Sequence, residues 1–92
     1  MSKVVEMKYV SAEPNPAGHD FVSVTVQPRP TNPNEMMTDF GGAYTTDDRS
    51  VAFINEKSFA FSNLADAIEA AEGIAQYHGI SVVYVIDRWS EK

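Results

Sequence analysis

A single amphipathic helix is the sequence feature that most constrains this fold. Apolar side chains recur at helical spacing from Leu64 to Ala75. Ser62 or Asn63 is suited to cap the first turn, and Gly79 falls where a helix is expected to end. The other apolar segments are short and rich in β-branched residues, which favours strands. The chain therefore predicts an α+β fold, a small and mostly antiparallel β-sheet with one main α-helix packed on one face.

Alternating apolar and polar residues predict the strands of this sheet. Residues 4–10 and 21–27 are expected to form an antiparallel pair, because the segment between them is too short for a helical crossover. The sheet face away from the helix is expected to be open, and so to be solvated or to meet a partner. Further strands are expected at residues 43–44, 51–55, 59–61 and 80–86.

A proline-rich segment interrupts the predicted sheet near residues 28–42. Three prolines fall within six residues, which removes donors from a strand ladder and favours an extended surface loop. A flexible joint is expected at Gly41 and Gly42. Such a loop suits docking on a partner, because prolines lower the entropy lost on binding and methionines adapt to irregular surfaces. The candidate contact residues are Arg29, Asn32, Asn34, Met36 and Met37, and the candidate charged anchors are Arg29 and Arg49.

Charge and composition exclude several classes of protein. The 92 residues carry a net charge of −6, which excludes the overall basic footprint of a nucleic-acid-binding domain. The absence of cysteine excludes disulfides, a thiol nucleophile and a thiolate metal site. No apolar segment approaches the length of a membrane span or a signal peptide, so a cytoplasmic location without a membrane partner is expected. Residues 1–92 are expected to form a single domain with a polar C-terminal tail at 87–92.

No side-chain pattern in the sequence is typical of catalysis or of a metal site. His19 beside Asp20 is interpreted as part of a turn rather than as an acid–base pair. His78 is interpreted as a residue that satisfies the last carbonyls of the helix and favours its dipole. Asp47 and Asp48 are interpreted as turn residues. The chain is therefore expected to have no catalytic residue, no metal, no cofactor and no small-molecule substrate.

Carboxylates follow the predicted helix on the side opposite its apolar stripe. Asp66, Glu69 and Glu72 are spaced three residues apart, so their like charges weaken the helix by a few tenths of a kcal/mol per pair. No Lys or Arg occurs between Lys57 and Arg88, whereas a helix that serves only solubility usually carries interspersed bases. Two interpretations stay open: a solubilising face, and a surface that meets a basic partner.

The chain resembles the small phage-encoded anti-CRISPR proteins directed against the type I-F (Csy, or Cascade) surveillance complex. The resemblance covers size and style along the whole chain, including the Ala-rich helix NLADAIEAAEGIAQYHG and the segment PRPTNPNEMMTDFGG. It implies a non-enzymatic inhibitor that binds Cas subunits in the cytoplasm of an infected bacterial host and blocks recognition of target DNA. The acidic helix suits mimicry of DNA on a basic Cas surface, whereas the segment around Arg29 suits wedging between subunits and the guide RNA.

Two other functions stay open at this point. Short strands leave sheet edges available, so the chain also suits a phage structural or assembly protein that associates with itself. A pocket near His19, Asp20 or Tyr44 would suit a small ligand-binding domain.

Overall fold

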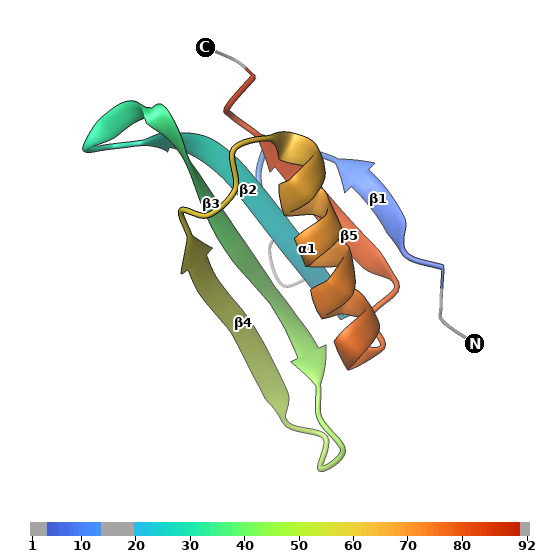
Figure 1. Ribbon diagram of the computed structural model, residues 1–92. Helices are drawn as coiled ribbons and strands as arrows, with labels where there is room; N and C mark the ends of the chain where they lie inside the picture. Colours follow the sequence, from blue (N-terminus) through green and yellow to red (C-terminus); the bar gives the residue numbers. More distant parts are fainter. Residues whose placement is uncertain (1–3, 14–19, 91–92) are drawn as a thin grey trace.

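In the residues that the structure describes, one β-sheet carries a single helix across one face. The fold is taken from a computed structural model that describes residues 4–13 and 20–90. In chain order, the elements of these residues are β1 (Glu6–Tyr9), β2 (Phe21–Arg29), β3 (Asn32–Thr45), β4 (Val51–Ser58), α1 (Leu64–His78) and β5 (Val82–Asp87) (Figure 1). The described strands form a five-stranded sheet in the order β1-β5-β2-β3-β4. The two longest pairings, β2 with β3 and β3 with β4, are antiparallel, whereas β5 runs parallel to β1 and β2. The predicted α+β class is confirmed.

Local sequence fixes both ends of α1 as expected. The side chain of Asn63 accepts a hydrogen bond from the backbone N–H of Asp66 at 2.9 Å, so Asn63 is the N-cap. Gly79 adopts a left-handed conformation with φ 69°, and its N–H donates to the carbonyl of Gln76 at 3.2 Å. The helix therefore begins and ends where the sequence predicts.

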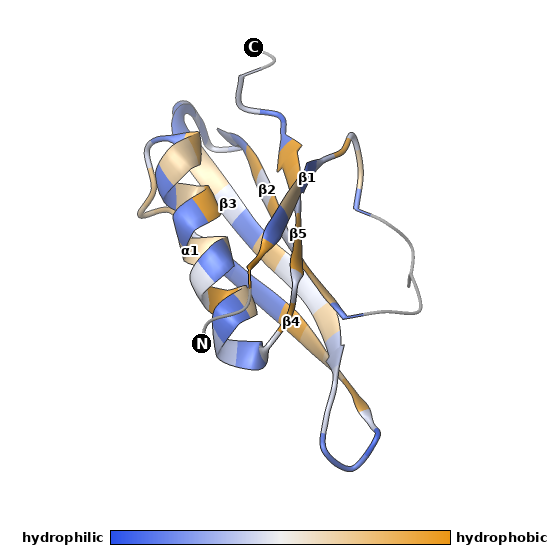
Figure 2. Ribbon diagram, turned by 90° about the vertical axis from the view of Figure 1, so that its right-hand side faces the viewer, coloured by the Kyte–Doolittle hydropathy of each residue, from blue (hydrophilic) through white to orange (hydrophobic). Residues whose placement is uncertain are grey.

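The core lies between α1 and the central strands. Figure 2, turned by 90° from Figure 1, shows α1 on one side of the sheet only, with apolar residues along β5. The helix contributes three alanines that are fully buried, and these small side chains let its backbone approach the sheet closely. The buried residues of this core are Val22, Val24, Val26, Met36, Phe40, Ala67, Ala71, Ala75, Ile80, Val83 and Val85.

The opposite face of the sheet is partly covered rather than fully open. Phe21 and Tyr84 pack edge to face with ring centroids 5.7 Å apart, and Val82 completes this second buried cluster. A Cβ added to Gly41 would lie 3.2 Å from the Oε1 atom of Glu13, so the segment after β1 passes over this face. The solvent-exposed area of this sheet face that is available to a partner is therefore smaller than the sequence indicates.

The predicted antiparallel pairing of the first two strands is wrong, because β5 lies between them. Met7 in β1 and Val22 in β2 both pair with Val83, and all three strands run parallel. Because β1 and β2 run in the same direction, the chain must return between Tyr9 and Phe21, and residues 14–19 of this connection lie outside the described part. The eleven residues of this connection can span about 36 Å when extended, which is enough to retrace a strand of this length.

The predicted loop at 28–42 is also wrong, because the segment is a tight hairpin. β2 continues through Arg29 and β3 begins at Asn32, with a register shift between Pro28 and Arg29. Pro28 is tolerated in β2 because the pairing between β2 and β5 ends before it, at Val26 and Asp87. On that side no described strand needs the N–H that proline lacks.

The expected joint at Gly41 and Gly42 is in fact the interior of β3. Gly42 has φ 141°, and a Cβ added there would lie 2.2 Å from the carbonyl oxygen of Phe21. Gly42 therefore allows the backbones of β2 and β3 to approach each other closely, and it does not act as a flexible joint.

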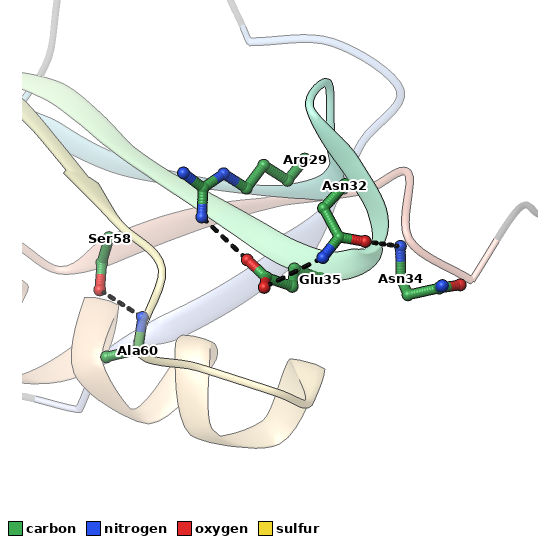
Figure 3. Close-up of polar contacts among 6 residues, drawn as sticks. All are labelled: Arg29, Asn32, Asn34, Glu35, Ser58 and Ala60. Carbon is green, nitrogen blue, oxygen red and sulfur yellow. Dashed lines mark hydrogen bonds and ion pairs between the residues drawn. The ribbon is translucent and has the colours of Figure 1, made fainter.

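The strand predicted at 51–55 is longer than expected, and the one at 59–61 is absent. β4 runs to Ser58, so no turn interrupts it at 55–58, and residues 43–44 belong to β3. The hydroxyl of Ser58 accepts a hydrogen bond from the N–H of Ala60 at 3.1 Å (Figure 3). This contact turns the chain out of the strand and toward α1. The final strand, predicted at 80–86, occupies Val82–Asp87.

Thr38→Val is expected to raise the free energy of unfolding by about 1 kcal/mol. Valine has nearly the same shape as threonine, and the substitution removes a fully buried hydroxyl that has no hydrogen-bond partner among the described residues. Urea denaturation followed by circular dichroism measures the change. Thr45→Val is the matched control, because the Thr45 hydroxyl donates to Asp20 at 3.2 Å and its loss brings no gain. A Thr38→Val variant less stable than the native protein would contradict this account.

Candidate functional site: the acidic surface of α1 and its groove

The outer side of α1 carries the acidic helix surface, defined by Asp66, Glu69 and Glu72. The buried alanine stripe fixes the rotation of the helix, so Asp66 and Glu69 are exposed and Glu72 is half-buried. Asp66 also accepts a hydrogen bond from the Asn63 side chain at 3.0 Å, which holds its carboxylate at the helix N-terminus. The predicted exposure is confirmed for Asp66 and Glu69, whereas Glu72 is partly covered.

No basic side chain neutralises this surface within the described part of the chain. The ion pairs found there are Arg29 with Glu35 at 2.8 Å and Lys57 with Asp39 at 3.9 Å, and neither involves α1. The acidic helix surface therefore presents uncompensated negative charge on a rigid element.

A groove of about 620 Å³ runs between α1 and β4. Tyr44 and His78 stack at one end with ring centroids 4.3 Å apart, and Tyr77 lies exposed next to them. Glu56 adds a carboxylate from the β4 side, whereas α1 contributes no acidic residue to the described lining. Its lining residues are Tyr44, Phe53, Ile54, Asn55, Glu56, Ala70, Gly73, Ile74, Tyr77 and His78.

The polar residues of the predicted docking loop instead hold the β2–β3 hairpin together (Figure 3). Arg29 donates to Glu35 at 2.8 Å, and its guanidinium lies 4.3 Å from the ring centroid of Phe59. Asn32 donates from its side chain to Glu35 at 3.1 Å and accepts from the N–H of Asn34 at 3.2 Å. The structure thus brings Arg29, Asn32 and Asn34 together around Glu35, and none of them forms an ion pair with the acidic helix surface in the described residues.

The two methionines of the predicted loop are buried rather than displayed. Met36 faces α1 in the core and Met37 packs on the opposite side of β3. Their expected role as adaptable surface contacts is therefore incompatible with the fold, because the hairpin places them in its strands.

Arg49 lies in the turn between β3 and β4, at the opposite end of β3 from Arg29. It has φ 68°, and its N–H donates to the carbonyl of Thr46 at 3.0 Å. Asp48 accepts from the hydroxyl of Thr46 and from the N–H of Ser50, and these bonds lower the pKa of the Asp48 carboxyl. Asp48 is therefore a turn residue as predicted, and the two candidate arginines cannot form one anchor.

Arg29→Ala is expected to lower the free energy of unfolding by about 1 kcal/mol, because both the ion pair and the contact with Phe59 are exposed and weak. Urea denaturation of the variant measures this loss. Arg29→Lys keeps the charge but not the planar guanidinium, so it should recover only part of the loss. Equal stability of all three proteins would contradict a structural role for Arg29.

The remaining predicted polar residues also serve the backbone. Asp20 accepts from the N–H of Thr45 at 2.9 Å, and His19 lies outside the described residues. Asp87 accepts from the N–H groups of Ser90 and Trp89, and these bonds, that of Ser90 first, lower the pKa of its carboxyl. The described part of the predicted polar tail at 87–92 is thus folded against the sheet, and Trp89 packs on the core.

The sequence predicts a strand at residues 51–55 but identifies no residue of β4 as part of a candidate site. Val51 and Phe53 are among the most exposed large apolar side chains, and Ile54 and Glu56 form the groove wall. The signal was present, because apolar residues in 51–54 fall on both faces of the strand, which is unusual for a strand covered on one side only.

The comparisons with known proteins leave the family of this chain open. Within the described residues, no helix is long and apolar enough to cross a membrane, and no group of three or more His, Asp or Glu side chains could hold a metal ion. No protein-family model matches the chain, and neither a curated protein nor a solved structure matches it.

Proposed function

We propose that this protein is a non-enzymatic, stoichiometric inhibitor that binds a basic surface of a bacterial nucleic-acid-handling complex through the acidic helix surface. The partner to test first is the type I-F CRISPR effector ribonucleoprotein, because the sequence resembles inhibitors of that complex. Binding there, in the cytoplasm of an infected host, would exclude target DNA from the surface that recognises it.

The observation that carries the proposal is the uncompensated charge of α1. Asp66, Glu69 and Glu72 have no ion-pair partner among the described residues. Repulsion between like charges at this spacing weakens an isolated helix. A basic protein surface would relieve this repulsion and gain complementary potential, which favours rapid and specific association.

The spacing of the three carboxylates supports mimicry of a nucleic-acid strand. Residues three apart on a helix are separated by about 4.5 Å along its axis. A strand of duplex DNA carries one phosphate charge per about 3.4 Å of its axis. The acidic helix surface therefore offers a basic groove a similar linear density of negative charge.

The contacts of Arg29 favour this route over wedging against the guide RNA. Its guanidinium is already engaged by Glu35 and Phe59, so binding RNA would first require both contacts to break. Met36 and Met37 are buried and supply no surface for a wedge.

The test is to add the purified protein to a purified type I-F effector complex and to measure binding of labelled target DNA by gel shift. DNA binding is expected to disappear at a small whole-number ratio of protein to complex. A tagged copy should retain the Cas subunits after nuclease treatment, because the contact is with protein. Raising the salt from 0.15 to 0.5 M should weaken the association, since exposed charges are screened beyond a Debye length of about 8 Å at the lower concentration.

The decisive control is an unrelated acidic protein of similar size and net charge, which should leave DNA binding intact. Full DNA binding at a tenfold excess of the protein, together with no recovery of Cas subunits, would remove the type I-F complex as partner. Retained inhibition at high salt would instead remove the electrostatic mechanism.

A further inference from the structure

The outer edge of β4 is the least protected feature of this fold. β4 is the last strand in the sheet order, and within residues 4–13 and 20–90 no strand pairs with its outer side. It is eight residues long and contains neither proline nor glycine. The other edge strand, β1, has only four residues. Natural sheets usually protect long edges with proline, bulges or a covering segment, because a free edge is a template for another strand.

The pairing register shows which backbone groups of β4 point outward. In the turn before β4, the N–H of Thr46 donates to the carbonyl of Ser50 at 2.8 Å, so this pair directs its polar groups inward. Hydrogen-bonded and non-hydrogen-bonded pairs alternate along antiparallel strands. The next inward residues are therefore Ala52, Ile54 and Glu56, and the N–H and C=O groups that point outward belong to Val51, Phe53, Asn55 and Lys57.

A second observation supports the same alternation. The N–H of Thr45 donates to Asp20, which immediately precedes β2, so residue 45 directs its polar groups toward β2. Its neighbour Tyr44 must then direct them toward β4, where it pairs with Ala52.

Apolar side chains flank this edge on both faces of the sheet. Phe53 is 76% exposed and Val51 is 59% exposed on the face away from α1. Ile54 is only half-buried on the other face, at the wall of the groove. Pairing with another strand would therefore cover apolar surface as well as satisfy backbone groups.

We propose that β4 pairs with the β4 strand of a second copy of this chain, antiparallel and about a two-fold axis at Ile54. The two sheets would then form one continuous sheet. In this register Phe53 lies opposite the partner's Asn55, and Val51 lies opposite the partner's Lys57. All four outward residues then exchange hydrogen bonds with the partner, giving about eight bonds between the chains.

Side-chain complementarity selects a second copy and this register. Ile54 meets the partner's Ile54 in a close, non-hydrogen-bonded pair, and the two Phe53 rings become diagonal neighbours. Glu56 lies opposite the partner's Ala52, far from the partner's Glu56. An axis at Asn55 would instead make the two Glu56 carboxylates diagonal neighbours, which is unfavourable. An axis at Phe53 would leave Lys57 without a partner residue from β4.

The interface is independent of the proposed inhibitory surface. A two-fold axis perpendicular to the sheet keeps both α1 helices on the same side, so each acidic helix surface stays free. Failure of the inhibition test would leave this pairing intact, and the reverse also holds.

Cysteine scanning tests both the pairing and its register, because the chain contains no cysteine. In Ile54→Cys the two thiols face each other across a pair whose Cα atoms lie about 4.5 Å apart, within the range of a disulfide. Mild oxidation should therefore convert this variant to a covalent dimer. Ala52→Cys is the matched control, because its two thiols would lie about 13 Å apart along the strands and should not react. Equal cross-linking of the two variants, or none in either, would overturn the proposal.

Asn55→Pro gives a test that does not depend on oxidation. It removes an outward N–H that no described residue accepts, so the fold of one copy should be retained, as checked by circular dichroism. Sedimentation equilibrium should then report a dimer for the native protein and for Asn55→Thr, and at least a tenfold weaker association for Asn55→Pro. A native protein that stays monomeric at about 0.1 mM, a concentration at which weak specific dimers form, would overturn the proposal.

Discussion

Gly42→Ala is expected to destabilise the fold by about 3 kcal/mol or more, a large part of the roughly 5–15 kcal/mol by which a small domain is usually stable. A Cβ at this position would lie 2.2 Å from the carbonyl oxygen of Phe21 and 3.0 Å from the Cα of Val22. Both atoms belong to the backbone of β2, which cannot move aside without breaking its pairing with β5. The φ of 141° adds strain for any residue with a side chain.

Gly73→Ala is the matched control, because it makes the same chemical change at an unobstructed position. No atom lies within 4 Å of the Cβ that would be added to Gly73, which is in the middle of α1. Alanine favours a helix over glycine by up to about 1 kcal/mol, so this variant should be more stable than the native protein. Urea denaturation of both variants measures the contrast. A loss below 1 kcal/mol in Gly42→Ala would show that β2 and β3 can separate locally at little cost.

Reversing the charge of Asp66, Glu69 and Glu72 to lysine is expected to weaken binding to the effector complex by about 100-fold, or about 2.7 kcal/mol. The three substitutions replace attraction by repulsion across the whole acidic helix surface. They also raise the net charge from −6 to zero, so a general charge effect must be separated from a local one.

A triple variant with the same change in net charge provides that separation. Glu6, Glu13 and Asp47 are exposed acids that lie outside α1, and their reversal to lysine should reduce affinity by less than about fivefold, through long-range steering alone. Surface plasmon resonance on the immobilised complex measures both affinities, and circular dichroism checks that both variants are folded. Equal losses in the two triple variants would contradict a specific role for the acidic helix surface.

The helix could be predicted from sequence because its signals are local. Asn63, the alanine stripe and Gly79 act within a few residues of one another, so each has the same meaning in any fold. The same locality placed Asp66 and Glu69 correctly on the outer side of α1. Whether they bind a partner is a separate property, which the fold leaves as a proposal.

The order of the strands could not be predicted, because it depends on contacts between distant segments. The short connection after β1 suggested a hairpin, but residues 82–87 compete for the same edge of β2 and pair with it instead. Prolines at 28, 30 and 33 suggested a loop, but they lie at the end of the β2–β3 hairpin. Because the segment is interpreted from sequence as a surface loop, neither the burial of Met36 nor the ion pair of Arg29 with Glu35 could be predicted.

The central position of β5 also determines when the domain can form. Met7 pairs with Val83, so the contacts that close the sheet join opposite ends of the described chain. Proteins dominated by such distant contacts fold slowly. During translation, β1 and β2 leave the ribosome without the strand that joins them, and the edge of β2 stays exposed until β5 follows. Newly made chains are therefore expected to be open to chaperones and proteases until β5 emerges, and chains truncated before residue 82 are expected not to complete the sheet.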